Sequence, residues 1–129
     1  MQMRSSGSVK VLYLDRQKVL AQVRQAVARL TRQHPEVEKV ILFGSMAKGT
    51  AVPGSDVDLL VVLSRSGRPF LERIPQYTPE DVGTGVDAFP YTEAELQRML
   101  EDGNPLVRQA LKEGVCLFER DASKQASPP

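Results

Sequence analysis

Two predicted strands, joined by a glycine-rich loop, constrain the fold of this chain more than any other feature. The first, Val37–Phe43, and the second, Asp56–Leu63, each end in an unbroken run of apolar residues. Such runs are typical of strands covered on both faces, so we expect both in one buried sheet. The segment between them, Gly44–Ser55, carries three glycines and a proline, which predicts a loop.

Apolar spacing and capping residues predict helices on either side of these strands. Apolar side chains recur at helical intervals between Leu12 and Leu30, and the basic residues between them indicate a solvated face. Further strands are expected at Val86–Phe89 and Val115–Phe118, with two short helices between them. The residues that begin or end the helices are Asp15, His34-Pro35, Thr92 with Glu95, Asn104-Pro105, and Gly114 in a left-handed conformation.

The order of these elements predicts an α/β (α+β) fold, a single small domain with a mixed sheet flanked by helices. The length of 129 residues suits one core. We expect a flexible leader at residues 1–8, the folded domain at 9–120 and a disordered tail at 121–129. Ser64–Gly85, with three prolines, is the hardest part to interpret and is expected to hold a short helix near Phe70–Ile74.

Composition excludes several functional classes. The net charge of +1 does not suggest autonomous nucleic-acid binding, which usually needs a strong basic excess. Cys116 and His34 are the only residues of their types, which excludes an internal disulfide and metal sites built from several such ligands. We expect Cys116 to pack as a small apolar residue. No apolar run approaches the roughly 20 residues of a membrane span, so a soluble, cytoplasmic protein is expected.

Asp56 and Asp58 are the first candidates for chemistry. Residues two apart on a strand point to the same face, so both carboxylates project together at the start of the second strand. Adjacent carboxylates repel each other unless a cation lies between them, and magnesium accepts one or two carboxylates together with substrate phosphates. The pair therefore favours a metal site, and a turn that simply leads into the strand is the alternative.

Gly44-Ser45 strengthens the metal-site interpretation because it directly follows a predicted buried strand. A glycine lets the backbone approach a ligand, and backbone N–H groups with a serine hydroxyl can hold phosphate oxygens. An ordinary strand-to-helix turn is the alternative for these two residues alone. A P-loop is excluded because Thr50, and not a lysine, follows Gly49.

Gly-Ser, ten further residues and Asp-x-Asp together resemble the signature of the nucleotidyltransferase superfamily that includes DNA polymerase beta. Phe43–Val62 looks like the minimal nucleotidyltransferase branch, and the resemblance extends over roughly residues 12–118. It implies the polymerase-beta-like fold. In that superfamily a third carboxylate comes from a later strand, which indicates Asp87, with Asp81 as a weaker rival in a predicted turn.

The resemblance implies transfer of a nucleoside monophosphate, most simply AMP from ATP, to an acceptor hydroxyl. The implied catalytic residues, which would also bind two Mg²⁺ ions (or Mn²⁺ in their place), are Asp56, Asp58 and Asp87. The implied nucleotide-binding residues are Gly44, Ser45, Lys48 and Ser55. Two of these have structural alternatives, because Lys48 is also typical of an exposed lysine and Ser55 of a residue that caps the turn.

Small members of this family are often encoded beside a small helical HEPN-type partner, a ribonuclease toxin. The resemblance therefore implies an antitoxin that adds AMP to a tyrosine of the toxin. Two alternatives stay open: an antitoxin that acts by complex formation alone, and a transferase for a small molecule or RNA end that needs another subunit. We expect Ser64–Gly85, with Phe70 and Tyr77, to lie at the mouth of the site as a docking surface, or else to fold back onto its own sheet.

Overall fold

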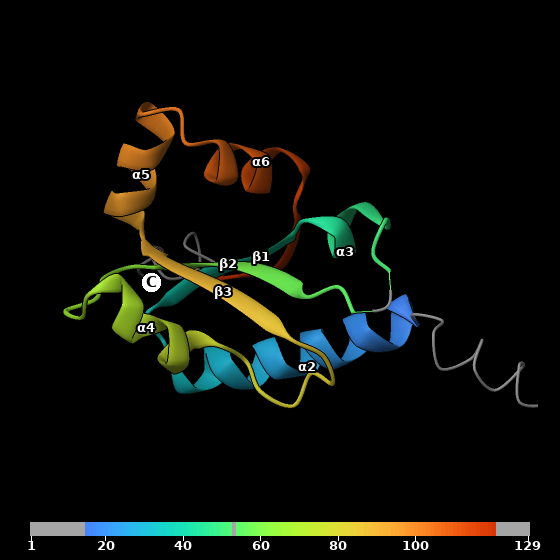
Figure 1. Ribbon diagram of the computed structural model, residues 1–129. Helices are drawn as coiled ribbons and strands as arrows, with labels where there is room; N and C mark the ends of the chain where they lie inside the picture. The colour runs from blue at the N-terminus through green and yellow to red at the C-terminus, as the bar shows by residue number, and fades with distance from the viewer. Residues whose placement is uncertain (1–14, 53, 121–129) are drawn as a thin grey trace, which may run out of the picture.

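The computed structural model describes residues 15–52 and 54–120, so the predicted leader, the predicted tail and Leu12 lie outside the described part. The elements in chain order are α2 (Arg16–Gln33), β1 (Val37–Phe43), α3 (Ser45–Lys48), β2 (Val57–Leu63), α4 (Phe70–Tyr77), β3 (Val86–Thr92), α5 (Glu93–Glu101), α6 (Pro105–Glu113) and β4 (Val115–Glu119). All four predicted strands are confirmed, and β3 extends past its predicted end. Figure 1 shows their arrangement.

One mixed sheet, with strand order β3-β2-β1-β4, forms the centre of the molecule. β1 lies antiparallel to β2 and β4, whereas β2 and β3 run parallel. α2 and α4 lie on one side of the sheet, and α5 and α6 on the other (Figure 1). In β2, Leu59 and Val61 pack in the core with α2, while Leu60 and Val62 pack with α5 and α6. The prediction that the central strands are covered on both faces is therefore confirmed.

Capping residues set the helix boundaries as predicted. The Asp15 carboxylate accepts a hydrogen bond from the Lys18 N–H at 3.0 Å, and α2 ends at His34, the residue before a proline. Thr92 and Glu95 form a reciprocal capping box at the start of α5. These local contacts explain why the sequence alone located the ends of the helices well.

α4 packs near the end of β3, at the opposite end of the sheet from α3 (Figure 1). The buried Arg73 guanidinium donates to both carboxylate oxygens of Glu95, at 2.7 and 3.0 Å, and to the Pro90 carbonyl at 3.1 Å. This ion pair ties α4 to the end of β3 and the start of α5. The helical part of Ser64–Gly85, with Phe70 and Tyr77, therefore does not lie at the mouth of the site as expected, whereas Thr84 and Gly85, at the end of that segment, reach the residues just before and at the start of β2.

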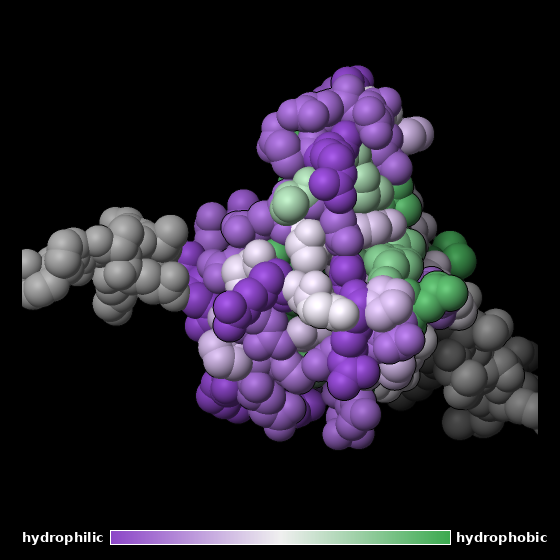
Figure 2. All heavy atoms as spheres, turned by 90° about the vertical axis from the view of Figure 1, so that its left-hand side faces the viewer, coloured by the Kyte–Doolittle hydropathy of each residue, from purple (hydrophilic) through white to green (hydrophobic). Residues whose placement is uncertain are grey.

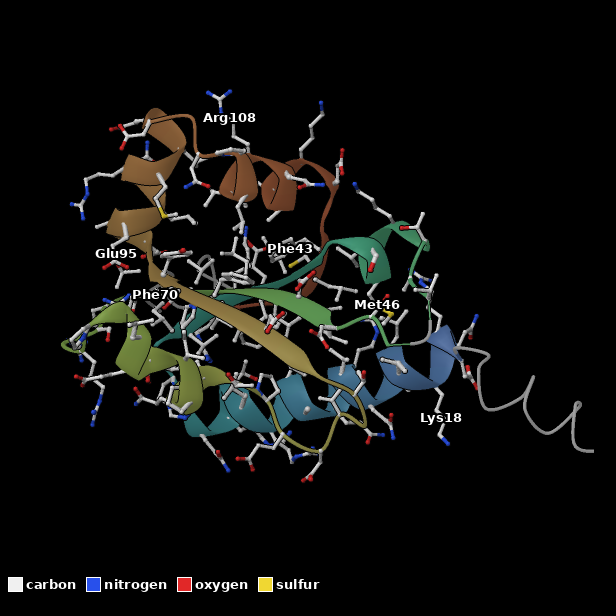
Figure 3. All side chains as sticks on the ribbon, in the orientation of Figure 1. Lys18, Phe43, Met46, Phe70, Glu95 and Arg108 are labelled. Atoms are coloured by element: carbon white, nitrogen blue, oxygen red, sulfur yellow. The ribbon has the colours of Figure 1, made fainter. Side chains whose placement is uncertain are left out.

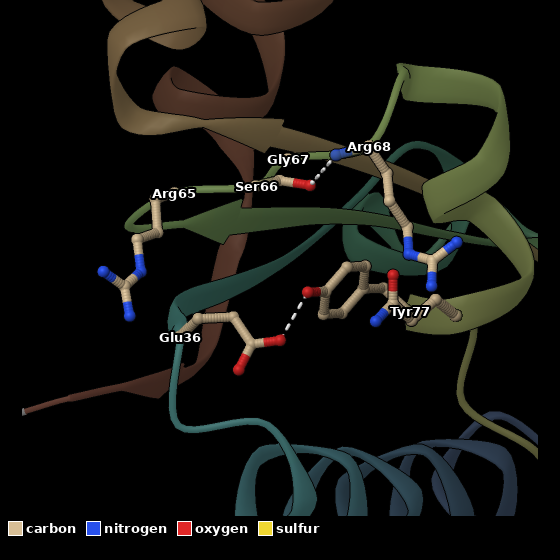
Figure 4. Close-up of a pocket in the computed structure, with 7 residues that line it drawn as sticks. Glu36, Arg65, Ser66, Gly67, Arg68 and Tyr77 are labelled. Atoms are coloured by element: carbon tan, nitrogen blue, oxygen red, sulfur yellow. Dashed lines mark hydrogen bonds between the residues drawn. The ribbon is translucent and has the colours of Figure 1, made fainter.

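The aromatic residues of α4 are mainly used within the fold. Tyr77 is buried, and its hydroxyl donates to the Glu36 carboxylate beside an open pocket of about 450 Å³ (Figure 4). The Phe70 ring stacks on Tyr91 with centroids 4.8 Å apart. Tyr77, and most of Phe70, are thus folded onto the protein's own sheet. Among the apolar side chains of α4, Leu71 is the most exposed, at 76%. Figure 2 shows that the end of the molecule on the left of Figure 1 is mainly hydrophilic, with smaller hydrophobic areas among the polar residues.

Two details near β4 differ from the prediction. Cys116 is exposed on β4, so its expected packing as a small apolar residue is wrong. Gly114 has φ −76° and ψ 165°, an extended conformation and not the left-handed one. Glycine is needed there for space, because a Cβ would overlap the Ile41 side chain and the Ala110 carbonyl. Across residues 15–52 and 54–120, no helix has the length and apolar character to cross a membrane.

Candidate active site

Three acidic residues lie at the end of the sheet where β1 ends and where β2 and β3 begin. The strand register pairs Phe43 of β1 with Asp58 of β2, and pairs Asp58 with Asp87 of β3. Asp56 lies just before β2. Because β2 and β3 are parallel, their first residues lie at the same end of the sheet, away from α4. The topology thus brings Asp87 next to a pair that lies much earlier in the sequence.

Gly44 forms the turn between β1 and α3. Its φ of 78° and ψ of −157° belong to a region that is essentially restricted to glycine. A Cβ at this position would overlap Oδ2 of Asp58 and lie 3.3 Å from its Cγ. Gly44 therefore meets two requirements together, since it permits the turn and leaves space for the Asp58 carboxylate.

Ser45 begins α3, a single helical turn that is held in place by contacts with α2 and the core. Met46 is fully buried and points from α3 toward α2 (Figure 3). The Arg16 guanidinium donates from Nε to the Met46 carbonyl at 2.9 Å and from Nη2 to the Ala47 carbonyl at 3.4 Å. The interpretation of the basic residues of α2 as a purely solvated face is therefore wrong for Arg16, which holds the turn that carries Ser45 in place.

Lys48 and Ser55, at the two ends of the loop, both have partners within the fold. The Lys48 ammonium lies 3.3 Å from the Glu113 carboxylate of α6, and both side chains are partly exposed. The Ser55 hydroxyl accepts a hydrogen bond from the Val52 N–H at 3.0 Å. Ser55 thus caps the turn that precedes Asp56, as its structural alternative predicted.

The Asp58 carboxyl is affected electrostatically by its burial and by the other two carboxylates. Burial raises the pKa of the Asp58 carboxyl, and the nearby charges of Asp87 and then Asp56 raise it further. Asp81 is not among these charges, and it lies with φ 63° in a loop beside α2. The geometry therefore favours Asp87 over Asp81 as the third carboxylate.

The segment that leads into β3 contacts the residues on both sides of Asp56, and the sequence did not predict these contacts. The Val57 N–H donates to the Gly85 carbonyl at 2.9 Å, and the Thr84 hydroxyl donates to the Ser55 carbonyl at 3.4 Å. These contacts join residues about thirty positions apart, and no local pattern marks them. The glycine two positions before Asp87 is the only signal that could have pointed to them.

The carboxylates fit a divalent cation that is shared with a substrate. Within the described parts of the chain, no three acidic, histidine or cysteine side chains converge closely enough to hold an ion by themselves. Asp56 and Asp87 are exposed and Asp58 is half-buried, so the site is open to a ligand. Hard oxygen donors of this kind suit Mg²⁺ or Mn²⁺, whose remaining positions are commonly filled by phosphate oxygens and water.

The family model described as polymerase beta, nucleotidyltransferase matches residues 25–123. The chain belongs to this family. The matched range includes the glycine turn and all three carboxylates of this nucleotidyltransferase, and the family acts on nucleoside triphosphates. A comparison with curated proteins finds no significant match.

Several solved structures share the nucleotidyltransferase fold. A candidate nucleotidyltransferase from Sulfolobus solfataricus has a TM-score of 0.59 at 23% identity, over 82% of this chain and 85% of that one. A toxin-antitoxin structure with AMP-PNP gives 0.53 at 19% identity, over 80% and 78%. A toxin-antitoxin MntA-HpeT variant, with two Asp-to-Glu substitutions two positions apart, gives 0.55 at 18% identity, over 80% and 78%. At these identities the likeness shows the fold, and it agrees with the fold predicted from the sequence.

Proposed function

We propose that this nucleotidyltransferase transfers AMP from ATP to an acceptor hydroxyl with the help of Mg²⁺. The observation that carries the proposal is that Asp56, Asp58 and Asp87 lie at one end of the sheet, beside the turn of Gly44. A cluster of carboxylates can hold divalent ions, and a glycine turn lets triphosphate oxygens approach the backbone. Nucleotidyl transfer needs the metal-binding carboxylates and the triphosphate-binding turn side by side.

The carboxylates have distinct roles in this proposal. Asp56 and Asp58 would hold both ions, and Asp87 would hold only the ion on the acceptor side. Bound Mg²⁺ stabilises the charge on the attacking and leaving oxygens. Asp87 is exposed on β3, an edge strand, so an acceptor hydroxyl can reach it. Its carboxylate accepts the hydroxyl proton as the oxygen bonds to the α-phosphorus and the bond to pyrophosphate breaks.

The loop residues would bind the leaving phosphates. Gly44 and Ser45 offer the backbone turn and a hydroxyl, and Lys48 would leave Glu113 to neutralise phosphate charge. Ser55 contributes indirectly, because its cap on the turn fixes the backbone just before Asp56. The loop is therefore the side of the site from which pyrophosphate departs.

We also propose an antitoxin role, in which the acceptor is a tyrosine of a small helical HEPN-type toxin in the cytoplasm. The toxin-antitoxin structures that share the fold support this role. One of these complexes was solved with two Asp-to-Glu substitutions two positions apart, which is also the spacing of Asp56 and Asp58 in this chain. Neutralisation by complex formation alone, and transfer to a small molecule or RNA end, are the competing outcomes.

Incubation with each α-³²P-labelled nucleoside triphosphate and Mg²⁺, with and without the product of the neighbouring gene, tests the proposal. We expect label to pass from ATP to the partner, and Asp56→Asn to slow this at least about 100-fold. Asp81→Asn is the matched control, because asparagine tolerates the positive φ of that turn. Equal transfer by Asp56→Asn would refute the site, and neutralisation of the partner without label would establish the binding alternative.

A further inference from the structure

Gly85 lies directly against the carboxylate of Asp56. A Cβ built on Gly85 would overlap Oδ1 of Asp56 and lie 3.2 Å from its Cγ. Gly85 is not among the glycines with positive φ, so a side chain at this position would not strain the backbone. Glycine is needed at this position because the Asp56 carboxylate occupies the place that a Cβ would take.

The backbone on both sides of Asp56 is held by the same segment. Val57, which follows Asp56, donates to the Gly85 carbonyl at 2.9 Å, and the carbonyl of Ser55, which precedes it, accepts from the Thr84 hydroxyl at 3.4 Å. Asp56 therefore has a fixed backbone, whereas its exposed side chain could rotate among several rotamers. The free volume above Gly85 is where the carboxylate lies.

We propose that Gly85 is a positioning residue for Asp56, an inference that rests on the proposed role of Asp56 as a metal ligand. A methyl group at position 85 displaces the carboxylate and not the sheet, because the end of a short side chain moves more easily than paired backbone. The fold therefore survives the change while one oxygen donor leaves its place beside Asp58 and Asp87. Gly44 stands in the same relation to Asp58, but there the positive φ adds backbone strain.

Mn²⁺ titration of Gly85→Ala, followed by electron paramagnetic resonance with and without α,β-methylene-ATP, tests this role without catalysis. We expect Mn²⁺ to bind about 10- to 100-fold more weakly, as for other residues that orient a metal ligand, with a melting temperature close to that of the wild type. Gly67→Ala is the matched control, because its Cβ meets nothing within 4 Å and its φ is also ordinary. It should change neither property.

A double-mutant cycle separates positioning from a general effect on the fold. Gly85→Ala should cause no further loss of Mn²⁺ affinity in an Asp56→Asn protein, but its full loss in an Asp87→Asn protein. Three outcomes would overturn the positioning role and leave the metal site standing. These are wild-type Mn²⁺ affinity in Gly85→Ala, an equal loss of Mn²⁺ affinity in the Asp56→Asn and Asp87→Asn proteins, and a Gly85→Ala protein that does not fold. Wild-type affinity in Asp56→Asn would instead refute the metal site, and the positioning role would fall with it.

Discussion

Asp58 and Asp87 stand directly opposite each other in the parallel pair of β2 and β3. Burial raises the pKa of the Asp58 carboxyl above its usual 3.8, and the charges of Asp87 and Asp56 add to this effect. An acid whose pKa is higher in the folded state makes folding less favourable once it ionises. The stability of the metal-free protein should therefore fall as the pH rises above 3.8 through the raised pKa.

Asp58→Asn should therefore stabilise the metal-free protein while it damages the site. At pH 7 in EDTA we expect its melting temperature to rise by roughly 2–4 °C, because no charge is then half-buried at this position and the repulsion by Asp87 and Asp56 is removed. Near pH 3 the difference should disappear, because the wild-type carboxyl is then protonated. Thermal unfolding at both pH values measures this, and a lower melting temperature for Asp58→Asn at pH 7 would contradict it.

The two glycines at the ends of α3 provide a second prediction. Gly44 has φ 78° and ψ −157°, whereas Gly49 has φ 79° and ψ 14°, the ordinary left-handed region. Alanine should cost about 2–3 kcal/mol of unfolding free energy at Gly44, and about 1 kcal/mol at Gly49. Urea unfolding measures both, and equal losses would show that the backbone at Gly44 relaxes.

A third prediction separates the two roles open to Lys48. Its ion pair with Glu113 is partly exposed, so Lys48→Ala should change the unfolding free energy by less than about 1 kcal/mol. If Lys48 binds phosphate, the same variant should bind a fluorescent ATP analogue about 10-fold more weakly, the effect of one charged hydrogen bond. Glu113→Gln breaks the same ion pair but keeps the lysine, so it should bind the analogue at least as tightly as the wild type. Equal weakening in both variants would show that only the ion pair matters.

The sequence predicted well those features that depend on residues close together in the chain, such as the helix caps. Asp15 and the Thr92–Glu95 capping box act within one helical turn, so their effect is visible in a short window of sequence. The placement of Asp56 and Asp58 together at the start of one strand was also predictable, because the two residues form a local pattern, whereas Asp87 came from the family resemblance. The close approach of the Asp56 carboxylate to Gly85 was not predictable, because it depends on the pairing of β2 with β3, which lie far apart in the sequence.

The burial of a residue was predicted poorly where it depends on the place of its strand or helix in the fold. Cys116 lies in an apolar run, yet its side chain is exposed on β4. Arg73 belongs to the segment that was hardest to interpret, and it is buried because Glu95 and the Pro90 carbonyl lie beside it in the fold. Without that contact in view, nothing in the sequence places α4 at the far end of the sheet.

The ion pair between Arg73 and Glu95 has a consequence for acid stability. Hydrogen bonding from the Arg73 guanidinium is the main cause that lowers the pKa of Glu95 from 4.5 to about 2. A carboxyl with a lowered pKa stabilises the folded state above its unfolded pKa. This contribution is therefore present above pH 4.5 and is lost as the pH falls toward 2.

Glu95→Gln tests this contribution, because glutamine can still complete the capping box with Thr92. At pH 7 the variant should be less stable by about 2 kcal/mol, the scale of hydrogen bonds to a charged group. On acidification it should lose less stability than the wild type, so the two curves should converge between pH 4.5 and about 2. Glu93→Gln, an exposed position in the same first turn of α5, is the control and should run parallel to the wild type. Parallel curves for Glu95→Gln and the wild type would show that the carboxylate contributes no acid-sensitive stability.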